Sequence, residues 1–326
     1  MPQTTLDRDV VKKAVLLACR APSIHNSQPW HWVADDAGLG LFVDRRRWMH
    51  SADSSGREAI ISCGAVLDHL RIAMMAAGWQ AKIDRLPDPN NPDHLASLEF
   101  SPLEFVTDAQ RRRADAILQR RTDRLPFAHP TYWSWFEPVL RRSVDDSVAM
   151  LDVLSEEVRP QLAKASYLTE DVRRYDASYQ AELQWWTSPF ALAEGIPPDA
   201  LASASEQWRV DVARDFPARS NVDRRADIGV DWSKILVLST AEDTPAEVLG
   251  CGEALSTVLL ECTTAGMATC TLTHLIEVGE SRDIVRRLMG GHGKPQVLVR
   301  VGIAPPLEDL PAATPRRPLD DVLEIQ

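Results

Sequence analysis

The segment Arg-Ala-Pro-Ser-Ile-His-Asn-Ser-Gln-Pro-Trp, which begins at Arg20, combines side chains suited to holding a flat polar ligand. Its two prolines fix the backbone φ angle and remove two amide donors, so the loop is expected to be extended and pre-shaped. Ser23, Asn26 and Gln28 supply short donors and acceptors that do not ionise. Such a loop suits a ring with polar edges. An ordinary proline- and asparagine-rich loop before a strand is the alternative.

Two arginine-rich segments could bind a phosphate. The first reads Arg-Arg-Thr-Asp-Arg at 120–124, and the second contains Arg316 and Arg317 between two prolines. A guanidinium group pairs with phosphate oxygens through two parallel, charge-assisted hydrogen bonds. The alternative is a solvated basic turn whose surface ion pairs contribute little. Arg316 is the better phosphate ligand of its pair, because Asp320 and Asp321 offer partners to Arg317.

These motifs together resemble FMN-dependent nitroreductases, and most of all the Acg family of nitroreductase-like flavoproteins. The pattern A-P-S-x-x-N-x-Q-P-W matches the flavin-side loop of nitroreductases, and residues 120–124 match their R-x-S-x-R phosphate motif. The resemblance implies FMN as the cofactor. It implies that the flavin contacts Arg20, Pro22, Ser23, His25, Asn26 and Gln28 in the first motif, and Arg120, Thr122, Arg124, Arg316 and Arg317 at the phosphate.

Arg20 is the arginine expected near N1 and O2 of the flavin, where positive charge would stabilise the reduced anion. As a residue at a helix end, it could instead neutralise the dipole of that helix.

A third segment, Thr271-Leu272-Thr273-His274, stands where the family runs along the flavin near N5. Many nitroreductases have a P-x-E-G-like sequence here, and this chain lacks that carboxylate, which puts the placing of nicotinamide in question. The four residues are nevertheless expected at the cofactor. For His274, a buried histidine with satisfied hydrogen bonds is the alternative to a proton donor.

Other chemistries find little support. Ser23 and His25 lie two residues apart without an acidic partner, so a hydrolase is not expected. The eight histidines have no metal-ligand spacing, so no metal is expected. We therefore expect no catalytic side chain, because the cofactor carries the electron chemistry.

The composition indicates a globular protein. Of 326 residues 44% are hydrophobic, and the net charge of −11 argues against nucleic acid or an anionic membrane as a partner. The five cysteines show no C-x-x-C spacing, there is no signal peptide, and no uncharged apolar run approaches a membrane span. A cytoplasmic location is expected.

The elements predict an α+β chain of two related halves, residues 1–105 and 106–326. Apolar helices around Gly64 and Gly252 match at a constant offset of 188 residues. Short strands are expected at 39–43, 235–239 and 297–303. Chance alignment of two buried helices is the alternative to a repeat.

The family resemblance implies that the chain is a nitroreductase homodimer fused into one polypeptide, a monomer with one FMN between its halves. The first half has the proline-serine-asparagine loop but no arginine motif before it, and the second half has the reverse. The chain therefore holds one complete set of parts.

An insertion at about 183–219 is dense in aromatic residues and prolines, and we expect it to form a lid over the flavin. Its expected lid residues are Trp185, Trp186, Phe190 and Trp208. A loop that covers an unrelated apolar surface is the alternative.

Two functions follow from the resemblance. The first is an oxidoreductase that moves hydride from NAD(P)H to FMN and then to nitro or quinone acceptors. The second is an idle protein that sequesters FMN or acts as a redox sink, with a lid that blocks nicotinamide. The fold does not decide between them.

Overall fold

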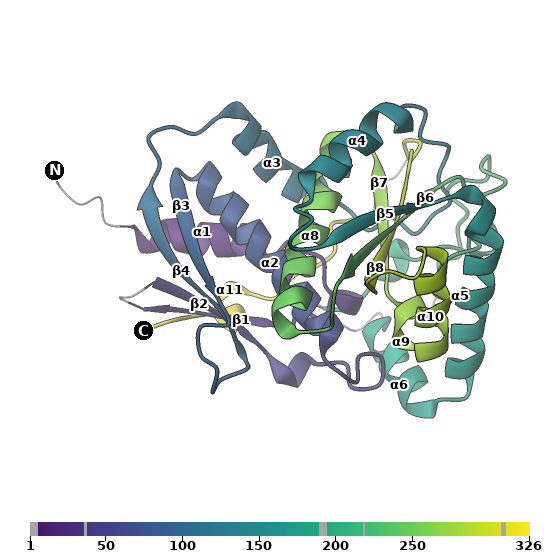
Figure 1. The fold of residues 1–326 in the computed structure, drawn as a ribbon, viewed down its shortest axis with the longest axis horizontal. Helices are drawn as coiled ribbons and strands as arrows, with labels where there is room; N and C mark the ends of the chain where they lie inside the picture. Colours follow the sequence, from purple (N-terminus) through teal and green to yellow (C-terminus); the bar gives the residue numbers. More distant parts are fainter. Residues whose placement is uncertain (1–5, 36–37, 189–193, 218, 308–310) are drawn as a thin grey trace.

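The computed structural model describes residues 6–35, 38–188, 194–217, 219–307 and 311–326. The chain has an α+β architecture in which two sheets flank a central group of helices (Figure 1). The helices are α1 Arg8–Ala18, α2 Arg57–Ala76, α3 Asp108–Gln119, α4 Trp133–Ser143, α5 Arg159–Arg174, α6 Ala177–Trp186, α7 Ala204–Trp208, α8 Pro245–Thr264, α9 His274–Glu277, α10 Gly279–Leu288 and α11 Leu319–Val322. The strands are β1 Trp30–Asp35, β2 Gly38–Val43, β3 Trp79–Arg85, β4 His94–Pro102, β5 Met150–Leu154, β6 Lys234–Thr240, β7 Ala268–Leu272, β8 Lys294–Gly302 and β9 Leu323–Ile325.

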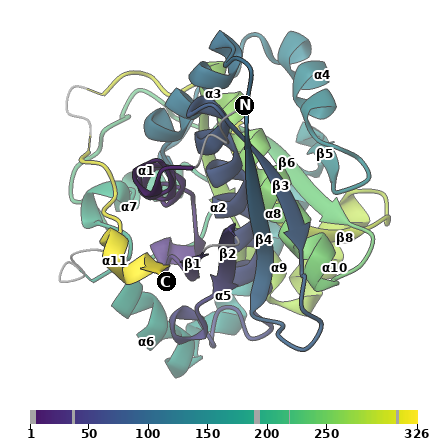
Figure 2. The same cartoon turned by 90° about the vertical axis from the view of Figure 1, so that its left-hand side faces the viewer.

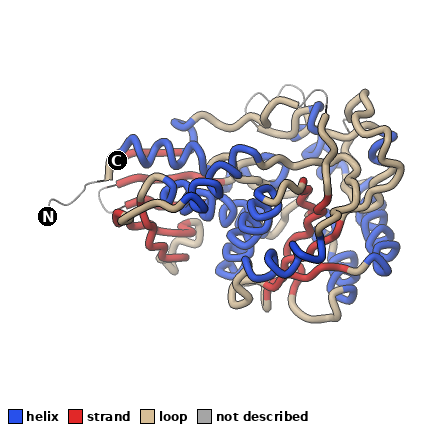
Figure 3. Tube along the Cα trace, turned by 90° about the horizontal axis from the view of Figure 1, so that it is seen from above, coloured by secondary structure: helices blue, strands red, loops and turns tan. Residues whose placement is uncertain are grey.

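The two sheets have corresponding strand orders. The first runs β3-β4-β2-β1-β9 and the second runs β7-β8-β6-β5. Every neighbouring pair is antiparallel except β1 and β9, which are parallel. The strands of the two sheets thus correspond in order and direction, and β9 is an addition to the first sheet. Seen from above, the strands form two groups with helices between them (Figure 3).

Helices α2 and α8 form the centre of the molecule, where they pack against each other (Figure 1). Each has 20 residues, and each is followed by a glycine with positive φ, Gly78 at 89° and Gly266 at 73°. Only glycine adopts this left-handed conformation freely, so it ends both helices. A capping box of Thr244 and Glu247 fixes the start of α8.

The two central helices cross at glycines. A Cβ atom on Gly64 would lie 2.1 Å from the carbonyl oxygen of Leu249, and one on Gly252 would lie 2.2 Å from that of Ile61. The contact is therefore reciprocal. Next to it, the Ser256 hydroxyl donates to Asp68 Oδ2 at 2.7 Å, and these two residues are also 188 positions apart.

Helix α2 is long and apolar enough to cross a membrane by length and composition, but 78% of that stretch is buried inside the protein. Its side chains belong to the core that packs against the first sheet, which includes the buried Trp30, Trp32 and Leu67. The apolar composition of α2 is thus that of a central core helix, covered on nearly all sides.

The C-terminal residues return to the first sheet. Helix α11 contacts α1 and β1, and β9 pairs with Trp32, Val33 and Ala34 (Figure 2). The sheet of residues 1–105 is therefore completed by a strand that comes from far beyond residue 105.

Candidate functional site

A cleft lies between the N-terminal end of α2 and the segment that follows β7. Its empty space, including the part open to solvent, is about 860 Å³. The loop of residues 22–25 forms one wall and β7 forms the other. The described residues that line it are Pro22, Ser23, Ile24, His25, Glu58, Ile61, Ser62, Thr122, Arg124, Gln207, Ala213, Arg214, Phe216, Leu255, Cys270, Thr271, Leu272, Thr273, His274, Val297 and Arg300.

The loop at the cleft mouth holds an unusual backbone conformation. His25, Asn26 and Gln28 have positive φ values of 45°, 59° and 51°. Residues other than glycine adopt this region at a cost, and such strain gathers at binding sites. The loop is held by neighbours, because Ile24 N–H donates to Ser62 Oγ at 3.2 Å and Gln28 N–H donates to Ser23 Oγ at 3.0 Å.

The Asn26 side chain connects its own loop to two distant segments by hydrogen bonds. Its Nδ2 donates to the carbonyl oxygens of Gly195 at 3.0 Å and Pro315 at 3.1 Å. The loop, the aromatic insertion and the C-terminal segment therefore meet at one side chain.

A narrower recess of about 470 Å³ continues from the cleft and shares Pro22, Ser23, Thr122 and Arg124 with it. Five arginines line this recess: Arg20, Arg120, Arg121, Arg124 and Arg316. None of the five forms an ion pair with a carboxylate in the part of the chain that the structure describes.

Burial and mutual repulsion lower the pKa of several of these guanidinium groups. The pKa of Arg120 falls to about 10, because burial and then Arg20 and Arg121 disfavour its charge. The pKa values of Arg20 and Arg316 are also lowered, in both cases by burial first. A cluster of cations with no carboxylate between them favours a bound anion.

Backbone contacts hold these arginines in place. Arg120 caps the C-terminus of α3 and donates to Arg20 O at 3.0 Å. Arg316 donates to Cys19 O at 2.7 Å and to Arg20 O at 3.1 Å. Thr122 forms a bridge with Thr269 of the β7 edge, so the motif runs beside that strand.

The structure brings most of the residues expected from the sequence to these two cavities. The cleft is lined by Pro22, Ser23, His25, Thr122, Arg124, Thr271, Leu272, Thr273 and His274, and the recess adds Arg20, Asn26, Arg120 and Arg316. Arg20 thus lies at the arginine recess and does not line the cleft.

Gln28 and Arg317 line neither cavity. Gln28 Oε1 accepts from Arg317 N–H at 3.0 Å, and Arg317 donates to the carbonyl of Gln28 and to that of Asp321. These two side chains therefore fasten the loop to the C-terminal segment.

Two of the tryptophans expected to form a lid face solvent. Trp185 is 64% exposed and Trp208 is 86% exposed, so neither covers the cleft. Trp186 is buried in an apolar cluster with Ile24. Phe190 lies outside the described residues. From the same insertion, other residues reach the cleft, namely Gln207, Ala213, Arg214 and Phe216.

The Phe216 ring contacts the His25 ring edge-on, with centroids 5.9 Å apart. The guanidinium carbon of Arg124 lies over the Phe216 ring, 5.3 Å from its centroid. One aromatic side chain of the insertion thus touches both the loop and the arginine motif.

Both histidines of the cleft are buried and neutral. Burial first, and then Arg214, lowers the pKa of His25 and of His274 well below the usual value. His274 Nε2 shares a hydrogen bond of 2.7 Å with Ser166 Oγ. His25 has no hydrogen-bond partner on either ring nitrogen among the described residues.

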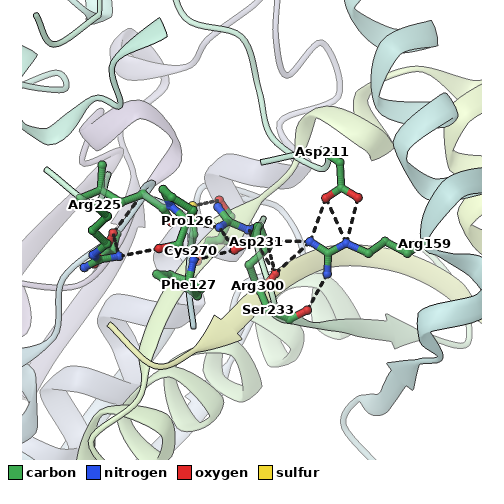
Figure 4. Close-up of polar contacts among 12 residues, drawn as sticks. Pro126, Phe127, Arg159, Asp211, Arg225, Asp231, Ser233, Cys270 and Arg300 are labelled. Atoms are coloured by element: carbon green, nitrogen blue, oxygen red, sulfur yellow. Dashed lines mark hydrogen bonds and ion pairs between the residues drawn. The ribbon is translucent and has the colours of Figure 1, made fainter. Parts of the chain in front are cut away.

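Three charged residues that line the cleft lie outside the motifs recognised in the sequence: Glu58, Arg214 and Arg300. Arg300 is fully buried on β8 and donates to Asp231 at 2.8 Å, and Asp231 also accepts from Arg159 at 2.7 Å (Figure 4). Arg300 Nη1 has no partner among the described residues. An arginine inside an apolar strand, and a glutamate inside an apolar helix, are the signals that the sequence offers.

Arg214 is anchored by an acidic partner. It forms an ion pair with Glu277 of α9, and it donates to Thr273 Oγ1 at 3.2 Å. The guanidinium charge at this side of the cleft is therefore compensated, unlike the charges in the recess.

Glu58 is a buried carboxyl at the cleft. Burial first, and then the neighbouring Glu277, raise its pKa from 4.5 to about 8 against the lowering effect of Arg57. Such a carboxyl is protonated at neutral pH. Among the described residues, no group of three or more histidine, cysteine, aspartate or glutamate side chains is placed to hold a metal ion.

The raised pKa of Glu58 predicts that stability falls as the pH rises. Between the ordinary value of 4.5 and about 8, the folded protein binds a proton that the unfolded chain releases, so raising the pH favours unfolding. We expect Glu58→Gln to remove this decline, which amounts to about 5 kcal/mol at most, measured by urea unfolding at several pH values. The exposed Glu280→Gln should keep the wild-type slope, and an unchanged slope in Glu58→Gln would contradict the assignment.

Comparison with known proteins identifies the family. No protein-family model matches the chain. The Mycobacterium tuberculosis protein named "Uncharacterized protein Rv3127" is 64% identical over 97% of this chain and 93% of its own length. "Putative NAD(P)H nitroreductase acg" of the same organism is 56% identical over 100% of this chain and 98% of its own length. The solved FMN-dependent nitroreductase NfnB of Mycobacterium smegmatis, in complex with NADPH, is 17% identical with a TM-score of 0.40, over 66% of this chain and 97% of that one. The chain therefore belongs to the Acg family of nitroreductase-like proteins.

Proposed function

We propose that the protein binds one FMN per chain and acts as an NAD(P)H-dependent oxidoreductase on nitro or quinone acceptors. The observation that carries this proposal is the arginine recess, whose five guanidinium groups have no carboxylate partner and open into the cleft. A relative with 56% identity is named "Putative NAD(P)H nitroreductase acg", which supports the same reaction class.

The residues present fit the cofactor at its phosphate end. Arg120 is 6% exposed and Arg316 is partly buried, yet they repel each other and neighbouring arginines. A phosphate would supply the missing negative charge and accept several charge-assisted hydrogen bonds. Thr122, which lines both cavities, adds a hydroxyl between the two ends.

The ring end also fits. The unpartnered His25 nitrogens and Arg300 Nη1 are buried polar atoms at the cleft, and buried polar atoms normally have partners. Arg300 would place positive charge near a reduced flavin, which such preorganised groups stabilise. When bound, the flavin would accept electrons from nicotinamide and pass them to an acceptor.

The residues of this chain then have distinct tasks. The arginines hold the phosphate, the loop from Ser23 to Asn26 orients the ring edge, and Phe216 excludes water from one side. Cys270 takes no part as a nucleophile, because burial raises the pKa of its thiol.

We propose further that the chain consists of two related halves, residues 1–105 and 106–326. The matching strand orders and the reciprocal contact of Gly64 with Gly252 support this division. The same reasoning makes the protein a monomer that resembles a dimer.

A second cavity at the opposite side of α2 and α8 supports one cofactor rather than two. Ala246 and Gly250 line it, and they stand 188 positions after Glu58 and Ser62 of the first cleft. Arg85 there is paired with Glu253 at 2.7 Å and Arg71 is paired with Asp68, so the arginines at this cavity already have anions.

The flavin content tests this part of the proposal. We expect a ratio of one FMN to one chain after reconstitution and gel filtration, from flavin absorbance against protein concentration, and elution at the size of one chain. A ratio near two, or an obligate dimer, would contradict it.

Sequestration of FMN is the second candidate, favoured by one observation. Gln207, Ala213, Arg214 and Phe216 of the insertion reach the cleft, where they could cover the ring face that nicotinamide must approach. Anaerobic mixing of the reconstituted protein with NADH and NADPH separates the two functions. Rapid bleaching of the flavin supports the oxidoreductase. A flavin that bleaches only with dithionite supports sequestration.

A cytoplasmic location belongs to the proposal. All five cysteines are free and buried, which is usual for proteins in a reducing compartment.

A further inference from the structure

Glu58 stands in the wall between two cavities. It lines the cleft described above, called here the inner cleft, and also an outer cleft of about 910 Å³ on the other side of the N-terminus of α2. The outer cleft is lined by Ala52, Asp53, Ser54, Ser55, Arg57, Glu58, Ile60, Asp243, Pro245, Val248, Ile276, Glu277, Gly279 and Arg282. The residue Glu58 therefore belongs to the walls of both spaces.

The two oxygen atoms of Glu58 have different surroundings. Oε1 accepts a long hydrogen bond of 3.3 Å from Arg57, while Oε2 is buried without a partner among the described residues. The side chain is only 2% exposed. A buried carboxyl oxygen without a partner normally costs free energy, so its retention points to a role.

Other ionisable groups surround Glu58. Arg57 and Asp53 face it from its own side of the outer cleft, and Glu277 and Arg214 face it from α9 and the insertion. Asp53 Oδ2 accepts from Ala59 N–H at 2.9 Å, and its pKa is raised by burial first.

Asp243 and Arg282, paired at 2.6 Å, lie farther along the outer cleft. The net effect of this surrounding is that Glu58 holds a proton at neutral pH, in keeping with its raised pKa.

The inner cleft has no other carboxyl among the described residues that line it. Its histidines are neutral, and Phe216 and Arg214 stand on the side of the insertion. A proton that reaches a ring bound there therefore needs a donor in the wall, and Glu58 is the acid in that position.

We propose that Glu58 carries protons from the outer cleft into the inner cleft. The proposal rests on the proposed function, in which NAD(P)H, an acceptor and one proton give NAD(P)⁺ and the acceptor with two added hydrogens. The nicotinamide supplies two electrons and one proton as hydride. The second proton leaves the Glu58 O–H bond toward the inner cleft, and the resulting carboxylate takes a proton from water in the outer cleft.

Hydrogen exchange at the carboxyl group tests the route directly. The infrared C=O band of the protonated Glu58 should be present at neutral pH in wild-type protein, absent in Glu58→Gln and unchanged in Glu280→Gln. In D2O the band should shift promptly both with and without FMN, because the outer cleft stays open when the inner cleft is filled. Exchange that stops on FMN loading would overturn the proposal.

A variant in the outer cleft tests the route while Glu58 stays intact. Gly279 lines the outer cleft, and a Cβ atom there meets nothing within 4 Å, so Gly279→Trp is the variant chosen to narrow this cleft. We expect it to slow the band shift at least tenfold with the band itself retained. A shift at the wild-type rate would overturn the proposal.

Proton uptake during reduction supplies the last comparison. With both proteins saturated with FMN and dithionite as the reductant, a pH indicator should report uptake at least tenfold slower in Glu58→Gln than in wild type. Equal rates would contradict the role of Glu58. Failure of every variant and of wild type to bind FMN would instead contradict the proposed function, while the exchange results on the apoprotein would still report the route.

Discussion

Arg120→Met is expected to weaken FMN binding by about 2–3 kcal/mol, or about 30–150-fold. Arg120 lines the arginine recess, is 6% exposed and has an unpartnered Nε. Among the described residues, its guanidinium group donates one hydrogen bond, to Arg20 O at 3.0 Å. Most of its donors are therefore available to a phosphate. Fluorescence titration of the apoprotein with FMN measures the change.

Riboflavin provides the sharpest control for this prediction, because it has the same ring and lacks the phosphate. Its affinity should be nearly the same in wild type and in Arg120→Met. Arg111→Met removes an exposed arginine of α3 that pairs with Asp108, and it should leave FMN affinity unchanged. An equal loss for riboflavin and FMN would mean that the variant alters the cleft as a whole.

The apoprotein should respond in the opposite sense. The arginines of the recess repel each other, which lowers their pKa values. Removing one charge relieves this repulsion, so the thermal midpoint of the unliganded variant should not fall below that of wild type. Loss of affinity without loss of stability distinguishes a binding residue from a structural one.

Gly64→Ala is expected to destabilise the protein by about 3 kcal/mol, although it adds only one methyl group. The added Cβ would lie 2.1 Å from Leu249 O and 2.8 Å from Gly252 Cα. These are backbone atoms of a packed helix, which cannot turn away as a flexible side chain can. The central helices would have to separate, and the inner cleft lies along α2, so FMN binding should weaken as well.

Urea unfolding measures this loss, and Gly229→Ala is the matched control. No atom lies within 4 Å of a Cβ at Gly229, which is exposed, so that variant should unfold like wild type. Wild-type stability in Gly64→Ala would show that the contact between α2 and α8 is looser than the structure indicates.

The sequence predicted those elements whose signal is local. The strands expected at 39–43, 235–239 and 297–303 correspond to β2, β6 and most of β8, because each is a short apolar run. Strand β9 was not predicted, because three residues near a helical turn have no pattern of their own and form a strand only against β1. Pairing over such a distance depends on the fold rather than on the segment.

The site divides in the same way. The loop from Arg20 and the arginine motif carry their chemistry in consecutive residues, so their types and spacing predicted residues that the structure places at the cleft and the recess. Glu58 and Arg300 come to the cleft from the middle of apolar elements, and only the packing of those elements places them there. The dense aromatics of the insertion predicted a cover, but consecutive residues of a helix face different directions, so Trp186 is buried while Trp185 is exposed.

The return of the C-terminal segment to the first sheet has a consequence for biosynthesis. Arg316 donates to the carbonyl of Cys19, 297 residues earlier, and β9 joins the sheet only after Arg316 has been made. During translation, the early loop and the arginine motif of residues 120–124 emerge long before this last arginine. A nascent chain therefore has an incomplete arginine recess for most of its synthesis. Loading with cofactor would consequently be a late event that follows chain elongation and does not guide it.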